Sequence, residues 1–81
     1  MQLRYHPRIA TQLAGAPLSV QKAFDKQIVL LAENLRHPSL RAKKYDEASD
    51  VWQARVTKGW RFYFQIDGDT YTILSVIAHP K

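Results

Sequence analysis

The first half of the chain carries apolar residues at helical spacing. One stripe is formed by Val20, Phe24, Ile28, Leu31 and Leu35. Apolar residues that recur every three or four positions lie on one face of an α-helix, which is the face that packs on a core. Ser19 is a suitable N-cap for this helix. The helix is predicted to end near Arg36, because His37 precedes a proline and is therefore disfavoured in the α-helical region.

A shorter pair of elements is predicted before this helix. Residues 2–6 form a candidate strand, and Pro7 can open a short helix because its fixed φ suits the first helical position. Ile9 and Leu13 lie four residues apart on one face, and Gly15 is a plausible stop. The link between the two helices is short, so we expect them to pack as a helical hairpin.

The second half of the chain has the pattern of a β-sheet. Aromatic and β-branched residues dominate three segments, at about 51–56, 60–66 and 70–78. The sequences Lys58-Gly59 and Asp67-Gly68-Asp69 are typical of the turns of β-hairpins. Residues 38–50 are predicted to be a connector. The whole pattern predicts a single α+β domain over residues 1–81, with an N-terminal strand and a helical hairpin packed on a small antiparallel β-sheet.

Alternation along the strands predicts which side chains share a face. The buried set is Trp52, Ala54, Val56, Phe62, Phe64 and Ile66, and the other face carries Val51, Gln53, Arg55, Thr57, Arg61, Tyr63 and Gln65. A three-residue loop over 57–59 keeps the buried set together, with Gly59 in the left-handed conformation. This loop pairs Val56 with Trp60 and places Arg55 opposite Arg61, away from the helices. Like charges in that position are destabilising, which favours use of the pair to bind an anion.

The last strand is apolar on both faces and is predicted to lie centrally in the sheet. A three-residue loop over 67–69 would place alternate residues of this strand on the arginine face. Those residues are Tyr71, Ile73, Ser75, Ile77 and His79. A two-residue loop would reverse this assignment.

Composition narrows the class of protein. The formal net charge is +5 on 81 residues, which favours polyanionic partners as well as solubility. Four cations, Arg36, Arg41, Lys43 and Lys44, occur in one short stretch without an acidic residue. There is no cysteine, and no segment is long and apolar enough to cross a membrane. The N-terminus lacks the apolar core of a secretion signal, so we expect a cytoplasmic protein without a membrane partner.

The residues that carry chemistry leave metal-free cleavage of RNA possible. The histidines His6, His37 and His79 lack the spacing of a metal site, and no cofactor is expected. RNA can be cleaved without a metal, because its 2′-hydroxyl is the nucleophile and the enzyme supplies cations and proton transfer. Arg55, Arg61 and His79 are the candidate catalytic residues. The alternative is that the arginines are only solvated and that His79 has no role. Arg41, Lys43, Lys44, Lys58 and Tyr63 are candidate RNA-binding residues.

The order of these motifs resembles the RelE/ParE toxin superfamily over nearly the whole chain. The resemblance is carried by Pro38, by the basic residues from Arg41 to Lys44, by Trp52-Gln53-Ala54-Arg55, by Gly59-Trp60-Arg61 and by His79. It implies a bacterial toxin of a toxin–antitoxin system, with a cognate antitoxin as its partner. For RelE-like members it implies an mRNA interferase, a metal-free endoribonuclease that cuts mRNA on the ribosome and inhibits translation. For ParE-like members it implies poisoning of DNA gyrase.

The resemblance also assigns roles to single positions. It implies that Arg61 contacts the scissile phosphate, that Arg55 is a second cation and that His79 is basic or transfers a proton. The sequence departs from the pattern at Gln53, where a catalytic lysine can occur, and at Pro80, where an arginine often follows the strand. It also lacks the C-terminal tyrosine or histidine of several toxins. A gyrase poison, a degenerate member that acts only as a binding module and an unrelated RNA-binding domain therefore remain alternatives.

Overall fold

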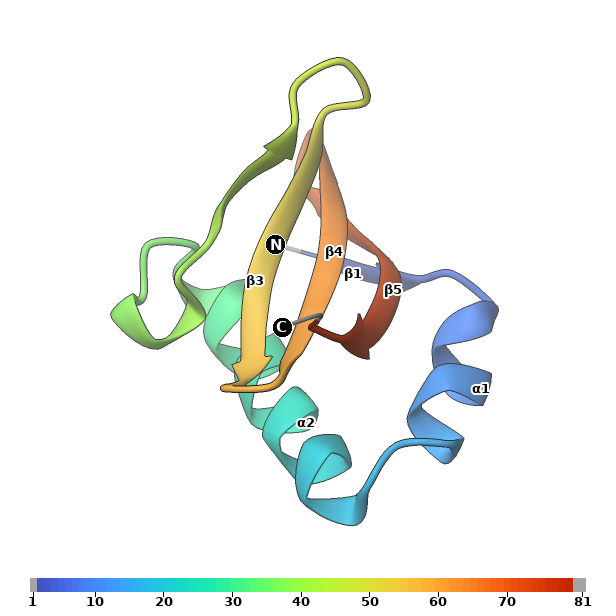
Figure 1. The fold of residues 1–81 in the computed structure, drawn as a ribbon. Helices are drawn as coiled ribbons and strands as arrows, with labels where there is room; N and C mark the ends of the chain where they lie inside the picture. Colours follow the sequence, from blue (N-terminus) through green and yellow to red (C-terminus); the bar gives the residue numbers. More distant parts are fainter. Residues whose placement is uncertain (1, 80–81) are drawn as a thin grey trace.

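A five-stranded sheet forms the centre of the molecule. The computed structural model describes residues 2–79. The elements follow in the order β1 (Gln2–Tyr5), α1 (Arg8–Ala14), α2 (Leu18–Glu33), the 3₁₀-helix η1 (Pro38–Leu40), β2 (Lys43–Asp46), β3 (Val51–Thr57), β4 (Trp60–Asp67) and β5 (Thr70–Ala78). The strand order is β1-β5-β4-β3-β2 (Figure 1). The predicted α+β class is confirmed, but β1 pairs with β5 in parallel, so the sheet is mixed rather than antiparallel.

The core lies between the helices and one face of the sheet. Helix α1 packs mainly against β5, and helix α2 packs mainly against β3 (Figure 1). Contact between the two helices is slight, so the predicted helical hairpin is held by the sheet more than by its own interface. Phe24 of α2 meets the ring of Phe62 from β4, and Leu31 and Phe64 belong to the same buried cluster. The predicted apolar stripe of α2 is confirmed at its buried positions, and Leu35 packs against the core from the edge.

The ends of α2 differ from the prediction. The N-cap is Pro17, which has an extended ψ of 148°, and Ser19 lies inside the first turn. The carbonyl of Pro17 accepts hydrogen bonds from the backbone N–H groups of Val20 and Gln21 at 2.9 and 3.1 Å. A proline can take this position because its missing N–H group is not needed there. At the other end the helix stops at Glu33, and Asn34 is already extended.

The predicted connector contains structure that the sequence pattern did not indicate. Residues Pro38–Leu40 form η1, and Lys43–Asp46 form the edge strand β2, which pairs with the start of β3. The sequence of β2 is mostly charged, so it lacks the apolar alternation by which strands are recognised. Charged side chains are common on edge strands, where they oppose pairing with another chain.

The register between β3 and β4 confirms the central prediction. Arg55 and Arg61 are cross-strand partners. The loop itself is shorter than predicted, because Thr57 rather than Val56 pairs with Trp60 and a bulge absorbs Val56. Gly59 does not have a positive φ, so the predicted left-handed conformation at this position is wrong. The left-handed glycine belongs instead to the next turn, where Gly68 has a φ of 60°.

A second bulge changes which side chains of β5 lie on each face of the sheet. Tyr63 pairs with Ser75, but its neighbour Phe64 pairs with Ile73, so Leu74 is inserted between them. The extra residue reverses the alternation. Ser75 and Ile77 therefore share a face with the arginines, as predicted, whereas Tyr71 and Ile73 are buried in the core. The prediction assumed uninterrupted alternation and was wrong for these two residues.

Candidate functional site

The face of the sheet away from α1 and α2 carries the predicted site. We call it the outer face, and it comprises the side chains of Gln53, Arg55, Arg61, Tyr63, Ser75 and Ile77. The register aligns them in two rows across β3, β4 and β5, with Gln53, Tyr63 and Ser75 in one and Arg55, Arg61 and Ile77 in the other. Alternation puts these residues opposite the core set of the same strands.

Arg61 is held at the turn between β3 and β4. Its Nη1 donates to the carbonyl of Thr57 at 2.8 Å, and carbonyls of Trp60 and Lys58 lie at 3.0 and 3.3 Å. Among the described residues, the Nε and Nη2 groups of Arg61 have no hydrogen-bond acceptor in the protein. These two groups form one edge of the planar guanidinium and match two oxygens of a phosphate. Arg61 is therefore both fixed in place and able to bind an anion.

Arg55 stands beside Arg61 without a carboxylate partner within the described part of the chain. Its side chain also makes no hydrogen bond to any described residue. Two neighbouring guanidinium groups repel each other, and an anion bound between them removes that repulsion. The pair is thus the strongest candidate on the outer face for binding the phosphate of a nucleic acid.

The predicted proton-transfer residue lies at the same turn. The backbone N–H of His79 donates to the carbonyl of Gly59 at 2.8 Å, and His79 is exposed to solvent. This bond brings His79, which is distant in sequence, to the turn whose carbonyls Arg61 caps. Lys58, a candidate RNA-binding residue, lies in that turn and is also exposed. The structure therefore brings Arg55, Arg61, Lys58 and His79 to one end of the β3–β4 hairpin.

Two tyrosine side chains lie beside the arginine row of the outer face. The rings of Tyr45 and Tyr63 meet edge to face with their centroids 4.9 Å apart. They line a hollow of about 300 Å³ together with Arg8 and Ile77. Tyr63 is more buried than expected, at 9% exposed, because Tyr45 of the unpredicted strand β2 covers it. Arg8 is a cation of this hollow that the sequence reasoning missed, because it lies on α1, far from the strands in sequence.

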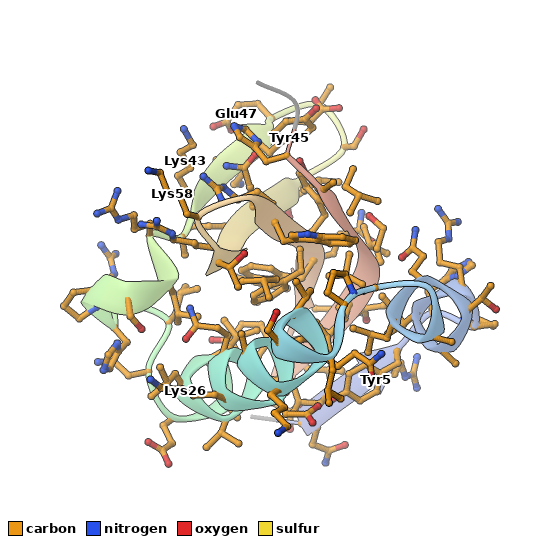
Figure 2. The ribbon with its side chains drawn as sticks, turned by 60° about the horizontal axis from the view of Figure 1, so that its bottom comes forward. Tyr5, Lys26, Lys43, Tyr45, Glu47 and Lys58 are labelled. Carbon is orange, nitrogen blue, oxygen red and sulfur yellow. The ribbon has the colours of Figure 1, made fainter. Side chains whose placement is uncertain are left out.

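Two of the remaining predicted RNA-binding residues, Lys43 and Lys44, lie on different faces of the sheet. Lys43 pairs with Gln53 and is exposed, and Figure 2 shows it on the same side of the molecule as Lys58. Lys44 points to the other face, where it lies 5.2 Å from the ring centroid of Trp52 and pairs with Asp50. Lys44 is therefore not part of the outer face.

Gln53 and Pro80 are two residues at which the sequence departs from the RelE/ParE pattern. Gln53, which stands where a lysine is expected, is only 8% exposed and lies beside Tyr63 on the outer face. It adds an amide to the site but no charge. Pro80 lies outside the described residues.

Solved structures with the same fold were found, although no protein-family model and no curated protein sequence matches the chain. A YoeB/ParE toxin from Agrobacterium tumefaciens superposes with a TM-score of 0.80 over 99% of this chain and 100% of its own, at 12% identity. The isolated RelE toxin of E. coli gives a TM-score of 0.75 over 99% of this chain and 85% of its own, at 17% identity.

The chain has the RelE/ParE toxin fold. A third structure with this fold, the RelB–RelE antitoxin–toxin complex from Methanococcus jannaschii, has a TM-score of 0.78 and 17% identity over 93% of this chain and 88% of that one. At these identities the likeness establishes the arrangement of the backbone. Among the described residues of this RelE/ParE-like fold, no helix is long and apolar enough to cross a membrane.

Tyr63 is held in its neutral form on this RelE/ParE-like scaffold. Burial raises the pKa of its phenol, the nearby Tyr45 raises it further, and Arg61 partly opposes the shift. A phenol with a raised pKa carries its proton at neutral pH and can donate a hydrogen bond, but it does not act as a base. Of Arg55, Lys58, Arg61 and His79, which gather at the β3–β4 turn, only His79 has a side-chain nitrogen that can accept a hydrogen bond.

Alkaline pH is expected to destabilise the protein through its buried tyrosines. Burial raises the pKa of both Tyr63 and Tyr71 above the ordinary value of 10.0. Above that value the unfolded chain loses phenolic protons more readily than the folded one, so the free energy of unfolding falls as pH rises. Urea denaturation between pH 8 and about 11 measures this slope. Tyr71→Phe should make the slope shallower, and an unchanged slope would contradict this assignment.

Proposed function

We propose that this protein is the toxin of a bacterial toxin–antitoxin pair and a ribosome-dependent, metal-free mRNA endonuclease that inhibits translation. The observation that carries the proposal is the pairing of Arg55 with Arg61 on the outer face, with His79 at the same turn. The RelE/ParE toxin fold supports it, since relatives of that fold are named as toxins and occur in complexes with antitoxins.

The chemistry follows from what RNA itself supplies. The 2′-hydroxyl attacks the adjacent phosphorus, the bond from phosphorus to the 5′-oxygen breaks, and a 2′,3′-cyclic phosphate and a 5′-hydroxyl result. Negative charge grows on the non-bridging oxygens in the transition state. The free edge of Arg61 and the guanidinium of Arg55 would stabilise this charge, and His79 would transfer a proton between the reacting oxygens. The ribosome would hold the mRNA in a reactive geometry.

The proposal implies three partners in the cytoplasm, namely the ribosome, its mRNA and an antitoxin that inhibits the toxin. The structural neighbours include RelB–RelE and YoeB–YefM complexes. A neighbouring reading frame that encodes a short acidic protein would fit the antitoxin, because this chain has a net charge of +5.

The test is cleavage of mRNA on purified ribosomes, followed by primer extension to map new 5′ ends. Wild-type protein is expected to produce such ends only when ribosomes are present. Arg55→Gln should reduce them strongly, whereas Arg4→Gln, on strand β1 at the far edge of the sheet, should leave them unchanged. The same protein is then induced in cells, with DNA supercoiling measured in parallel. Intact mRNA with gyrase-dependent DNA breaks would replace this proposal by a ParE-like gyrase poison. Intact mRNA and normal DNA would leave a binding module.

A further inference from the structure

A hollow with cationic walls lies between α2, η1 and the end of β3. Its volume is about 560 Å³, and it is lined by Lys26, Arg41 and His37 with apolar surface between them, and by Arg55 where its backbone carbonyl accepts from Gln27. No described carboxylate lines it. We call it the η1 hollow. Cations gathered around an open concavity without acidic partners repel one another and favour a bound anion.

The floor of the η1 hollow is held in place by Gln27. This residue is almost fully buried on α2, and its side-chain amide donates to the carbonyls of Ser39 and Arg55 at 3.0 and 2.8 Å. One amide thus ties η1 and β3 to the same helix. Breaking either bond would leave a polar group in a half-buried position without a partner, which is costly. The backbone positions of η1 and β3, from which Arg41 and Arg55 extend, are therefore fixed before any ligand binds.

His37 is oriented as a donor toward an anion. The backbone N–H of Ser39 donates to its Nδ1 at 3.2 Å. Nδ1 is therefore an acceptor, so the proton of the neutral ring is on Nε2. Within the described residues Nε2 of His37 has no protein partner. His37 can thus offer an N–H to an anion even without a positive charge.

Arg41 is held in an unusual backbone conformation at the rim of the hollow. It ends η1 with a φ of 47°, in the left-handed region where non-glycine residues are uncommon. Such strain persists only where surrounding contacts enforce it, and it is concentrated at functional sites. Arg41 and His37 also line a smaller hollow of about 160 Å³ on the other side of η1, together with Arg36. Cationic residues therefore line both hollows that border η1.

We propose that the η1 hollow binds a phosphate of the RNA strand one or more nucleotides away from the phosphate that is cleaved. The inference rests on the proposed function for the identity of the strand. Arg55 joins the two places through its position on β3, because it is the cross-strand partner of Arg61 and its backbone carbonyl borders the η1 hollow. Figure 2 shows nitrogen atoms along the side of the molecule that runs from Lys43 and Lys58 to Lys26. An RNA strand that follows this side stays in contact with positive charge beyond the outer face. Contacts between cationic side chains and phosphates position a nucleic acid on a protein.

The test measures binding of a short single-stranded RNA whose 2′-hydroxyls are methylated, so that it cannot be cleaved. Fluorescence anisotropy at about 50 mM salt compares wild type with Arg41→Gln and Lys26→Gln. Each variant is expected to bind about five- to tenfold more weakly, because a charge-assisted phosphate contact is lost. The slope of log K against log salt should fall by about 0.7 for each lost contact. Arg4→Gln is the matched control, because it removes the same charge from the far edge of the sheet.

The outcomes separate this inference from the proposed function. RNA affinity that falls for Arg41→Gln but not for Arg4→Gln supports the η1 hollow even if no mRNA is cut. Equal losses in the two variants, or no loss in either, would overturn it even if the wild type cleaves mRNA. On ribosomes Arg41→Gln should raise the protein concentration needed for half-maximal cleavage and leave the cleavage rate at saturating protein unchanged. A lower rate at saturating protein, with the half-maximal concentration unchanged, would also contradict a binding role. Thermal melts of each variant verify that it is folded.

Discussion

Replacing Arg61 by glutamine is expected to lower the rate of mRNA cleavage on the ribosome about 10²- to 10³-fold. Under the proposed function the loss is large because the free Nε–Nη2 edge of Arg61 would stabilise charge that develops only in the transition state. Glutamine keeps part of the length of the side chain but offers a single neutral amide. The measurement is single-turnover cleavage at saturating protein, followed by primer extension. A rate within about threefold of wild type would show that Arg61 does not stabilise the reacting phosphate.

Arg61 also stabilises the β3–β4 turn. A second variant is therefore needed to separate this structural role from the proposed role in cleavage. The bonds from Nη1 to the carbonyls of Thr57 and Trp60 are lost in Arg61→Gln, and the melting temperature should fall somewhat. Arg55 makes no such bonds to the described residues. Arg55→Gln should therefore slow cleavage without lowering the melting temperature. If both variants are folded and both cleave at the wild-type rate, the arginine pair is not the site.

The arginine pair could be predicted from the sequence because it depends on local rules. Alternation assigned Arg55 and Arg61 to one face, and the turn at Lys58-Gly59 set which residues face each other across it. The details of the loop were wrong, since a bulge at Val56 replaces the third loop residue. The pairing of the arginines was nevertheless correct, because the bulge adds one residue to the strand and the shorter loop removes one. The missed bulge and the overestimated loop length therefore offset each other in the predicted register of β3 and β4.

Features that depend on distant segments could not be predicted. The bulge at Leu74 exchanges the faces of β5, and no turn or glycine marks it in the sequence. Strand β2 covers Tyr63 although its own sequence lacks a strand pattern. Arg8 reaches the hollow beside Tyr63 from a helix, and Gln27 joins three elements that are far apart in the chain. Each of these contacts is set by tertiary packing, which periodicity within one segment does not encode.

Replacing Phe24 by alanine is expected to lower the free energy of unfolding by about 3–5 kcal/mol. Phe24 is only 3% exposed on α2. Its ring meets Phe62 edge to face, with centroids 5.7 Å apart and planes at 84°. Phe62 in turn packs against Phe64, so the removed ring is one of the contacts through which α2 joins the aromatic core of the sheet. The variant loses buried apolar area and leaves a cavity, because the strands cannot close over the space.

Val29→Ala is the matched control, since Val29 lies on the same helix but is 56% exposed. Its stability should stay within about 0.5 kcal/mol of wild type, because exposed surface substitutions have small effects. Urea denaturation measures both variants, and an unchanged m-value shows that the midpoints report stability. A loss below about 1 kcal/mol for Phe24→Ala would place the ring at the periphery. A large loss would also bear on function, because α2 carries Gln27 and thereby positions η1 and the backbone of Arg55.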